Sequence, residues 1–261
     1  MALENLPETF RGFRIVHLTD IHHGLYFPAE ALKAVVELTN ELEPDLVAVT
    51  GDFVTRSRAY IEPAAEILGE LRAREGVFAV LGNHDFRVGA DEITRALDRY
   101  GIEILRNRHT RLRRQGQTCY LAGIDDFRYR ADLARAMRGV PRNAPAILLS
   151  HNPRIIRAAA RMGISLVLSG HTHGGQVRLP VVGSIYGRSG ERSRFKSGRD
   201  SLGATQIYVS RGIGTVVLPV RYGCPSEIPH FVLEPNRELD TEASWFAPPK
   251  GWPTARPDAR S

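Results

Sequence analysis

Two histidines after a short apolar run have the spacing of a metal-binding pair. His171 and His173 lie in the stretch Ser169 to His173, directly after the run Ile164 to Leu168. In extended backbone, the side chains of residues i and i+2 point to the same side. We therefore expect both imidazole rings to face one site from an extended loop that follows a strand.

Four other segments carry similar side chains, and each begins where a short apolar run ends. They are Asp20-Ile21-His22, Gly51-Asp52, Gly82-Asn83-His84-Asp85 and Ser150-His151-Asn152. Any one of these motifs alone is typical of an ordinary turn. The alternative to a common site is five unrelated turns at five strand ends, and their joint occurrence favours the common site.

The elements that would position these segments alternate between strands and helices. Apolar runs bounded by Gly, Pro or polar residues predict buried strands, and helical periodicity lies between them. The predicted strands cover residues 13–19, 46–50, 77–81 and 146–150, and the predicted helices cover 29–42, 61–74, 91–100 and 154–162. Asp20, Asp52 and Asn83 are spaced by roughly 30 residues, the length of one βαβ unit. Because ligands bind at the carboxyl ends of strands in such folds, we expect all five segments at one edge of one sheet.

The donor atoms of these segments are carboxylate and amide oxygens and imidazole nitrogens, without a cysteine. Such a set suits Mn, Fe or Zn and disfavours a structural zinc, which usually takes thiolates. There are too many candidates for one tetrahedral ion, but two ions roughly 3.5–4 Å apart could share them through a bridging carboxylate. Asp52 is the best bridge, since it is central in chain order and follows a glycine. The seven candidate ligands are Asp20, His22, Asp52, Asn83, His151, His171 and His173.

A two-ion site of this kind lowers the pKa of a shared water and clamps a phosphoryl group from both sides. His84 and Asp85 would then lie beside the site as a pair that does not ligate. A histidine held by a carboxylate can stabilise charge or donate a proton to a departing oxygen.

The five blocks, in this order from about residue 13 to residue 173, resemble the calcineurin-like metallophosphoesterases. Gly174-Gly175-Gln176 and the later segments Ser210–Gly214, Leu218–Arg221 and Gly223–Ile228 resemble the bacterial YkuE/YaeI-type branch of that family. The resemblance implies a four-layered α/β/β/α sandwich with two mixed β-sheets and a metal site at the carboxyl-terminal edge of the strands.

The resemblance also implies a role for each candidate residue. The first ion would take Asp20, His22, Asp52 and His173, and the second would take Asp52, Asn83, His151 and His171. His84 would be the catalytic histidine and Asp85 its orienting partner. Many relatives carry a second Asp three residues after the bridging one, where this chain has Thr55. That Asp is not a direct ligand in the family pattern, so metal binding should survive while the local loop differs.

The predicted function is that of a binuclear metal-dependent phosphoesterase, most simply a phosphodiesterase, in which a metal-activated hydroxide cleaves a P–O bond. Manganese is the expected metal, with Fe or Zn as alternatives. One alternative function is a UDP-2,3-diacylglucosamine-type pyrophosphate hydrolase that acts on a lipid precursor, and another is a nuclease. A third is a non-catalytic scaffold on the same fold, which would tend to lack the histidine that this chain retains as His84.

Substrate contacts are predicted at Arg211 and Arg221, because their glycine-rich surroundings let a ligand approach closely. The basic segment Arg188 to Arg199 is either an electropositive lip that attracts phosphate esters or a solvated loop. The Arg-rich run Arg106 to Arg114 suits an exposed edge or hairpin strand. The expected partner is a phosphate-ester substrate, and a peripheral contact with anionic lipid stays open. No dedicated nucleic-acid motif is present.

The bulk properties fit one globular domain. The chain has 261 residues, 25% of them charged and 43% hydrophobic, and a formal net charge of +6. We expect a domain over residues 1–240 and a Pro-rich surface-lying or disordered arm over 241–261. Cys119 and Cys224 give no disulfide framework. Without a secretory signal or a membrane-length run, a cytoplasmic enzyme is expected, or a chain from which a leading anchor has been removed. The sequence predicts no oligomeric state.

Overall fold

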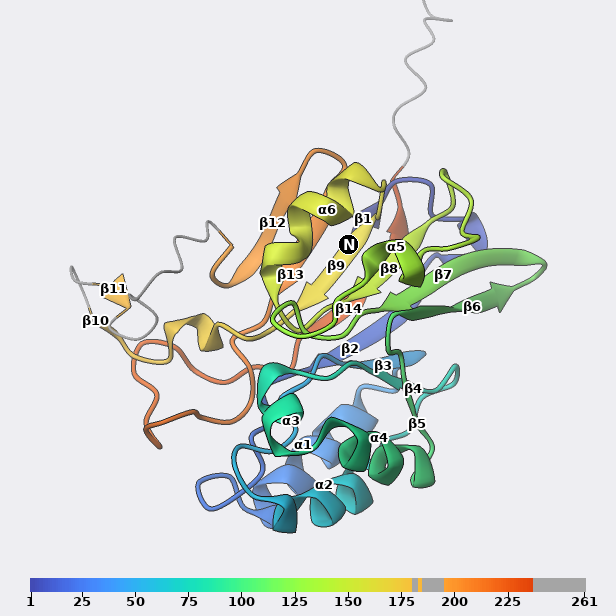
Figure 1. The fold of residues 1–261 in the computed structure, drawn as a ribbon. Helices are drawn as coiled ribbons and strands as arrows, with labels where there is room; N and C mark the ends of the chain where they lie inside the picture. Colours follow the sequence, from blue (N-terminus) through green and yellow to red (C-terminus); the bar gives the residue numbers. More distant parts are fainter. Residues whose placement is uncertain (180–182, 185–194, 237–261) are drawn as a thin grey trace, which may run out of the picture.

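Two β-sheets lie face to face between two layers of helices in the computed structural model (Figure 1). The structure describes residues 1–179, 183–184 and 195–236. Helices α1 to α4 cover the outer face of one sheet, and α5 and α6 cover the outer face of the other. Both sheets combine parallel and antiparallel strands. The predicted sandwich with two mixed sheets is therefore confirmed.

The five-stranded sheet is built from successive βαβ units in the first half of the chain. Its order is β14-β2-β3-β4-β5, with β2 to β5 parallel and β14 antiparallel to β2. The strands are β2 (Arg14–Leu18), β3 (Leu46–Val49), β4 (Val77–Ala79), β5 (Ile102–Ile104) and β14 (His230–Val232). The helices are α1 (Ala29–Glu41), α2 (Ile61–Leu68), α3 (Asn83–Val88) and α4 (Ala90–Arg99), with a 3₁₀ turn at Arg58–Tyr60.

The six-stranded sheet comes from the part of the chain between residues 108 and 209. Its order is β12-β13-β9-β8-β7-β6, with a parallel centre and an antiparallel strand at each edge. The strands are β6 (Arg108–Arg114), β7 (Gln117–Gly123), β8 (Ala146–Leu149), β9 (Leu166–Ser169), β12 (Gly198–Leu202) and β13 (Thr205–Val209). The helices are α5 (Leu133–Ala136) and α6 (Ile156–Arg161), the latter after a 3₁₀ turn at Pro153–Ile155. The Arg-rich run is the edge strand β6, as predicted.

The remaining elements are short. They are β1 (Ala2–Leu3) paired with β15 (Glu234–Pro235), β10 (Arg178–Leu179) paired with β11 (Gly183–Ser184), and 3₁₀ turns at Glu8–Phe10 and His173–Gly175. No helix among the described residues has both the length and the apolar character needed to cross a membrane.

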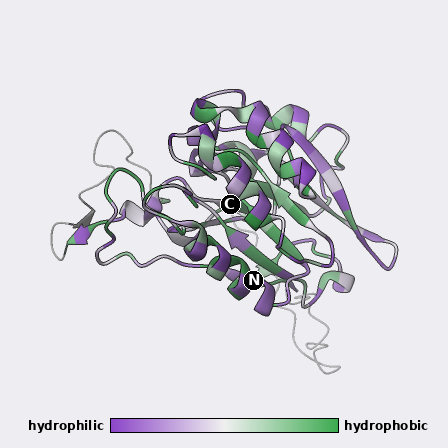
Figure 2. Ribbon diagram, turned by 90° about the horizontal axis from the view of Figure 1, so that it is seen from below, coloured by the Kyte–Doolittle hydropathy of each residue, from purple (hydrophilic) through white to green (hydrophobic). Residues whose placement is uncertain are grey.

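Three apolar cores separate the four layers, and the central strands contribute side chains to two cores each. In β3, Leu46 and Ala48 face the core between the sheets, whereas Val47 and Val49 pack against the helix layer. In β8, Ile147 points between the sheets and Leu148 points toward α5 and α6. This is the two-residue alternation of side chains in a strand. Figure 2 shows the central strands as mainly hydrophobic and the helices as mixed.

Two predictions about the elements are wrong. The five polar segments do not follow strands of one sheet, because β2, β3 and β4 belong to the five-stranded sheet and β8 and β9 to the six-stranded sheet. The helix predicted over 61–74 ends at Leu68 and is followed by Gly69, where a side chain would clash with Tyr100. The arm over 241–261 and most of the basic segment 188–199 lie outside the described residues.

Candidate metal centre

The candidate ligands meet where the carboxyl ends of both sheets come together. Asp20 and His22 follow β2, Asp52 follows β3, and Asn83 begins α3 after β4. His151 follows β8, and His171 and His173 follow β9. Six of the seven are buried, and His171 is half-buried. The structure thus brings together all seven residues that the sequence singled out.

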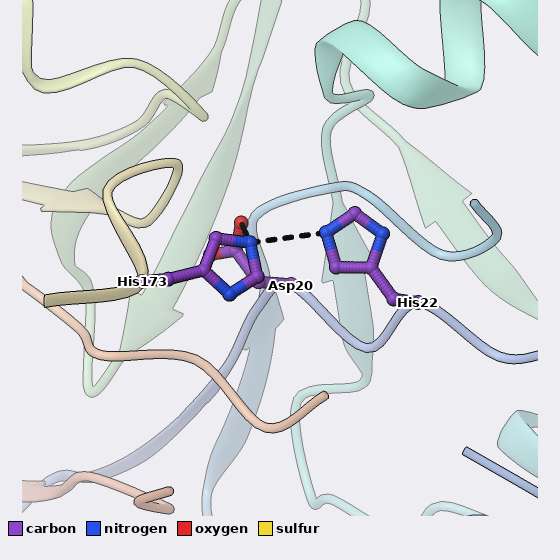
Figure 3. A group of neighbouring side chains, drawn as sticks. All are labelled: Asp20, His22 and His173. Atoms are coloured by element: carbon purple, nitrogen blue, oxygen red, sulfur yellow. Dashed lines mark hydrogen bonds and ion pairs between the residues drawn. The ribbon is translucent and has the colours of Figure 1, made fainter. Parts of the chain in front are cut away.

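The first group of side chains surrounds the Nε2 atom of His173. This atom lies 3.2 Å from Asp20 Oδ1 and 3.1 Å from His22 Nε2, and the two rings stack with centroids 4.9 Å apart (Figure 3). His22 Nε2 also lies 3.5 Å from Asp52 Oδ2.

The second group surrounds the Nε2 atom of His151. It lies 3.3 Å from Asp52 Oδ2, 3.3 Å from Asn83 Oδ1 and 3.1 Å from His171 Nδ1. The same oxygen of Asp52 therefore stands within 3.5 Å of a histidine nitrogen in each group. This is the position that a bridging carboxylate requires.

The spacing of the donor atoms fits bound cations. Atoms about 2.0–2.1 Å from one tetrahedral ion stand roughly 3.3–3.4 Å apart, close to the separations within each group. Two neutral ring nitrogens that face each other at 3.1 Å share one hydrogen at most, and a cation between them satisfies both lone pairs. The ring of His151 is oriented so that its Nε2 atom faces the site. Its Nδ1–H donates to the carbonyl oxygen of Thr50 at 2.8 Å, which leaves Nε2 for a cation.

The electrostatics also favour cations. Burial opposes ionisation of Asp20 and Asp52, but attraction from histidines, His173 and His151 respectively, outweighs it and keeps both pKa values below the usual range. Burial lowers the pKa of His22 to about 3 and also lowers the pKa of His173, so both rings are neutral donors at pH 7. Burial lowers the pKa of His151, but Asp52 overcomes this and raises it to about 10. A cation at His151 must therefore displace a proton.

The backbone is strained at five of the seven candidate ligands. Their φ angles are positive: 51° at Asp20, 51° at His22, 57° at Asp52, 71° at His171 and 51° at His173. Non-glycine residues rarely adopt this region, and such strain clusters at functional sites. The prediction of an extended His171–His173 loop is therefore wrong, since both residues are left-handed and a 3₁₀ turn begins at His173. Both rings nevertheless reach the site.

His84 lies beside the first group, but its partner differs from the predicted one. Its ring meets that of His22 edge-on at 4.9 Å, and its Nδ1–H donates to the carbonyl oxygen of Thr55 at 3.0 Å. The Asp85 carboxylate instead accepts backbone N–H bonds from Gly82, Asp52 and Phe53 at 2.7–2.9 Å. Asp85 thus fixes the loop that carries Asp52, and the Thr55 carbonyl orients His84. Burial and the neighbouring Asp52 raise the pKa of Asp85 to about 8, against these bonds.

Thr55 also holds His22. Its hydroxyl lies 3.3 Å from His22 Nδ1 and donates to the His22 carbonyl oxygen at 3.3 Å. With Nδ1–H directed at the hydroxyl, the Nε2 atom of His22 is left for the site. The residue that departs from the family pattern therefore positions one candidate ligand and the candidate catalytic histidine.

The two arginines predicted to contact substrate are bound to protein groups. Arg211 pairs with Glu227, with Nη2 and Oε2 2.5 Å apart. Arg221 donates to the carbonyl oxygens of Arg211, Gly212 and Gly214. Neither lines the cavity above the candidate ligands. The structure therefore gives both arginines a role in holding the loop after β13.

The sequence missed the residues that form the walls of this cavity. The cavity has a volume of about 460 Å³, and its base includes Asp52, Asn83, His84, His171 and His173. Its walls carry three exposed arginines and three valines: Arg56, Arg87, Arg128, Val88, Val216 and Val217. Arg87 had a usable signal, because it lies one helical turn after Asn83 and so shares its face of α3. Arg128, Val216 and Val217 come from loops whose proximity the sequence does not reveal.

Comparisons with known proteins agree with this geometry. The sequence matches the calcineurin-like phosphoesterase family over residues 13–175. It is 34% identical over 238 residues to the uncharacterized metallophosphoesterase YkuE of Bacillus subtilis, covering 88% of this chain and 82% of that protein. It is 30% identical over 220 residues to phosphodiesterase YaeI of Escherichia coli, covering 83% and 80%.

A longer relative is the transmembrane protein with metallophosphoesterase domain of Danio rerio, which is 36% identical over 250 residues. The alignment covers 90% of this chain, and the chain spans 56% of the length of that relative. Among solved structures, NAD nucleotidase of Haemophilus influenzae superposes with a TM-score of 0.50 at 14% identity, covering 77% of this chain and 50% of that one. This likeness concerns the fold.

The resemblance to the YkuE/YaeI-type branch is thus confirmed. The family match covers more than half of the chain and includes all seven candidate ligands. The chain belongs to the calcineurin-like metallophosphoesterase family.

Proposed function

We propose that this protein is a binuclear metal-dependent phosphodiesterase. The observation that carries the proposal is the single oxygen of Asp52 shared between two groups of buried donor atoms. When bound, two divalent cations, with Mn²⁺ expected, would supply Lewis acidity to a water molecule and to the phosphoryl oxygens. The family membership supports the same reaction class.

The chain itself contributes charge, orientation and a proton. Asp20 and Asp52 supply the negative charge that a dication needs, and the neutral rings of His22 and His173 complete the first group. Asn83, His151 and His171 complete the second. Because the Thr55 carbonyl takes the Nδ1–H of His84, the imidazolium form of that ring would donate its Nε2–H to a departing oxygen and leave the neutral ring held by Thr55.

His84→Ala tests this assignment. We expect turnover of bis(4-nitrophenyl) phosphate to fall about 10²–10⁴-fold, while the Mn²⁺ content after dialysis stays that of the wild type, because His84 is placed outside both groups. His230→Ala is the matched control, since His230 is exposed and does not line the cavity. Loss of both ions in His84→Ala would make His84 a ligand. If the wild type hydrolyses no phosphate ester with Mn, Fe, Zn or Mg, the result would favour the non-catalytic scaffold instead.

A second candidate function is hydrolysis of a lipid-linked nucleotide pyrophosphate, and an exposed apolar segment that begins at the cavity favours it. Val217 lines the cavity, and the chain continues from it to Leu218, Val220 and Tyr222. Each of these four residues, which we call the apolar lip, is 51–55% exposed. The lip is held in place by buried Gln176, whose amide donates to two carbonyl oxygens of the loop and accepts from Val216 N. Val217 has a φ of 64°, a costly conformation for a β-branched residue. A rigid apolar lip suits an acyl chain or a lipid surface.

Leu218→Ser/Val220→Ser separates the two candidates. If the lip binds acyl chains, the double variant should cleave a UDP-diacylglucosamine in mixed micelles about tenfold more slowly, with bis(4-nitrophenyl) phosphate turnover unchanged. Met162→Ser, at an exposed apolar residue after α6, is the control. Equal rates on the lipid substrate in all three proteins would remove the lipid candidate and leave the simple diesterase.

A further inference from the structure

The cavity extends well beyond the two groups of candidate ligands. Its volume of about 460 Å³ lies in the range of cavities that enclose whole small-molecule ligands, so parts of a substrate other than the reacting phosphoryl group lie inside it. The residues that line it differ in chemistry, because they include three arginines and three valines.

The three arginines gather around α3, on the side of the cavity that holds Asn83 and His84. Arg87 lies on α3 one turn after Asn83. Arg56 follows Thr55, whose carbonyl oxygen accepts from His84. Arg56 and Arg87 thus come from the two chain segments that also hold His84, and both line the cavity.

Arg128 reaches the same side from the other sheet, on the turn after β7. The backbone N–H of Arg128 donates to Asp126 Oδ1 at 3.0 Å, which fixes the turn. The next residue, Tyr129, stacks on Phe86 of α3 with ring centroids 4.5 Å apart, and its hydroxyl donates to the Asn83 carbonyl oxygen at 3.4 Å. Three separate segments thus each contribute an arginine to the lining of the cavity.

Val216 and Val217 lie on a loop that begins on the side of the first group. The loop that carries Val216 and Val217 begins beside Asp20, because Ile213 N donates to Thr19 O at 3.1 Å and Gly214 N to Asp20 O at 2.8 Å. Among the residues that line the cavity, Asp52 is the one carboxylate, and under the proposed function its charge is taken up by cations. The lining around α3 therefore carries the arginines together with Val88, and the lining from the loop of Val216 and Val217 is apolar.

We propose that Arg56, Arg87 and Arg128 form an anion subsite that binds a second phosphate or phosphonate group of the ligand, beyond the one at the metal centre. The inference rests on the proposed function and narrows its substrate class to esters with a further negative charge, such as diphosphate diesters or phosphorylated diesters. Guanidinium groups suit this role, because their planar donors bind phosphate oxygens in pairs.

The test is a comparison of two ligands that the enzyme does not cleave. Methylphosphonate carries one phosphonate group and methylenediphosphonate carries two. Titration calorimetry on the Mn²⁺-loaded chain gives a Kd for each, in the wild type and in Arg56→Gln/Arg87→Gln/Arg128→Gln. The control is Arg72→Gln/Arg95→Gln/Arg142→Gln, which removes the same charge from exposed arginines that do not line the cavity.

We expect the wild type and the control to bind the diphosphonate at least about tenfold more tightly than the monophosphonate, as charge-assisted bonds from guanidinium groups imply. The cavity variant should lose most of that preference while its monophosphonate Kd changes by less than about threefold. If the cavity variant keeps the full preference for the diphosphonate, that preference comes from the metals alone, and the proposed subsite is overturned. Equal weakening of both ligands, or no binding of either by the wild type, would also overturn it. Because these readouts need no turnover, they stand apart from failure of the hydrolase itself.

Discussion

At the scale of single residues, main-chain groups and single side chains hold the candidate catalytic and metal-binding residues in place. The seven candidate ligands follow predicted strand ends and could be named from type and spacing. The partner of His84 could not, because a backbone carbonyl carries no side-chain signal and Thr55 offers it through its main chain. Nor could the pairing of Arg211 with Glu227, sixteen residues away, be read from either residue.

Thr55 gives the first prediction at this scale. Thr55→Val keeps the carbonyl oxygen that holds His84 but removes the hydroxyl that holds His22. We expect the affinity for Mn²⁺ to fall about 10–100-fold, as for other partners that orient metal ligands, and Thr55→Ser to restore most of it. Metal titration of the chelated proteins measures both. If Thr55→Val binds Mn²⁺ as the wild type does, the hydroxyl does not position His22.

His17 gives a prediction about pH. The ring is fully buried, its Nε2 is paired with the Thr50 hydroxyl at 2.8 Å, and burial lowers its pKa from 6.5 to about 3. Below about pH 6.5, His17 is protonated in the unfolded chain and stays neutral in the folded chain. The free energy of unfolding therefore falls as the pH drops from 6.5 toward 3. His17→Gln should remove about 1.4 kcal/mol of this loss per pH unit.

Urea unfolding of the chelated proteins at pH 7, 6 and 5 measures the effect. His230→Gln, at an exposed position, should follow the wild-type slope. A His17→Gln protein that loses stability with acid as steeply as the wild type would show that His17 is not kept neutral in the fold.

At the scale of elements, strands were predicted better than the loops between them. The apolar runs around β2, β3, β4 and β8 gave both their positions and their burial, because two-sided burial leaves a continuous hydrophobic run. Sheet membership was not visible, since β4 and β8 carry equally apolar runs but lie in different sheets. The left-handed backbone at His171 and His173 was also hidden, because the surrounding fold imposes it against the local preference of the chain.

Gly170 provides the prediction at this scale. A Cβ atom there would clash with the Thr19 hydroxyl and the Asp20 carboxylate. Gly170→Ala should therefore displace Asp20, lower the free energy of unfolding by about 1–3 kcal/mol and weaken Mn²⁺ binding. Gly24→Ala, where the nearest heavy atom outside the neighbouring residues is 3.7 Å away, is the control. Denaturant unfolding and metal titration should separate the two variants, and wild-type values for Gly170→Ala would contradict the contact.

At the scale of the whole molecule, the centre depends on both halves of the chain. Asp20, His22, Asp52 and Asn83 come from the five-stranded sheet, and His151, His171 and His173 come from the six-stranded sheet. The core between the sheets, which includes Ala48 and Ile147, sets their separation. The four layers could be expected from the family resemblance, whereas the βαβ spacing alone suggested a single sheet.

Asp52 joins the two halves, so its removal tests the centre most directly. The measurement is the number of Mn²⁺ ions that stay bound per chain after reloading and dialysis, by elemental analysis, in the wild type and in Asp52→Ala. We expect two ions in the wild type and fewer than one in Asp52→Ala, together with loss of phosphodiester turnover. Two tightly held ions in Asp52→Ala, or none in the wild type, would contradict a binuclear centre built around this carboxylate.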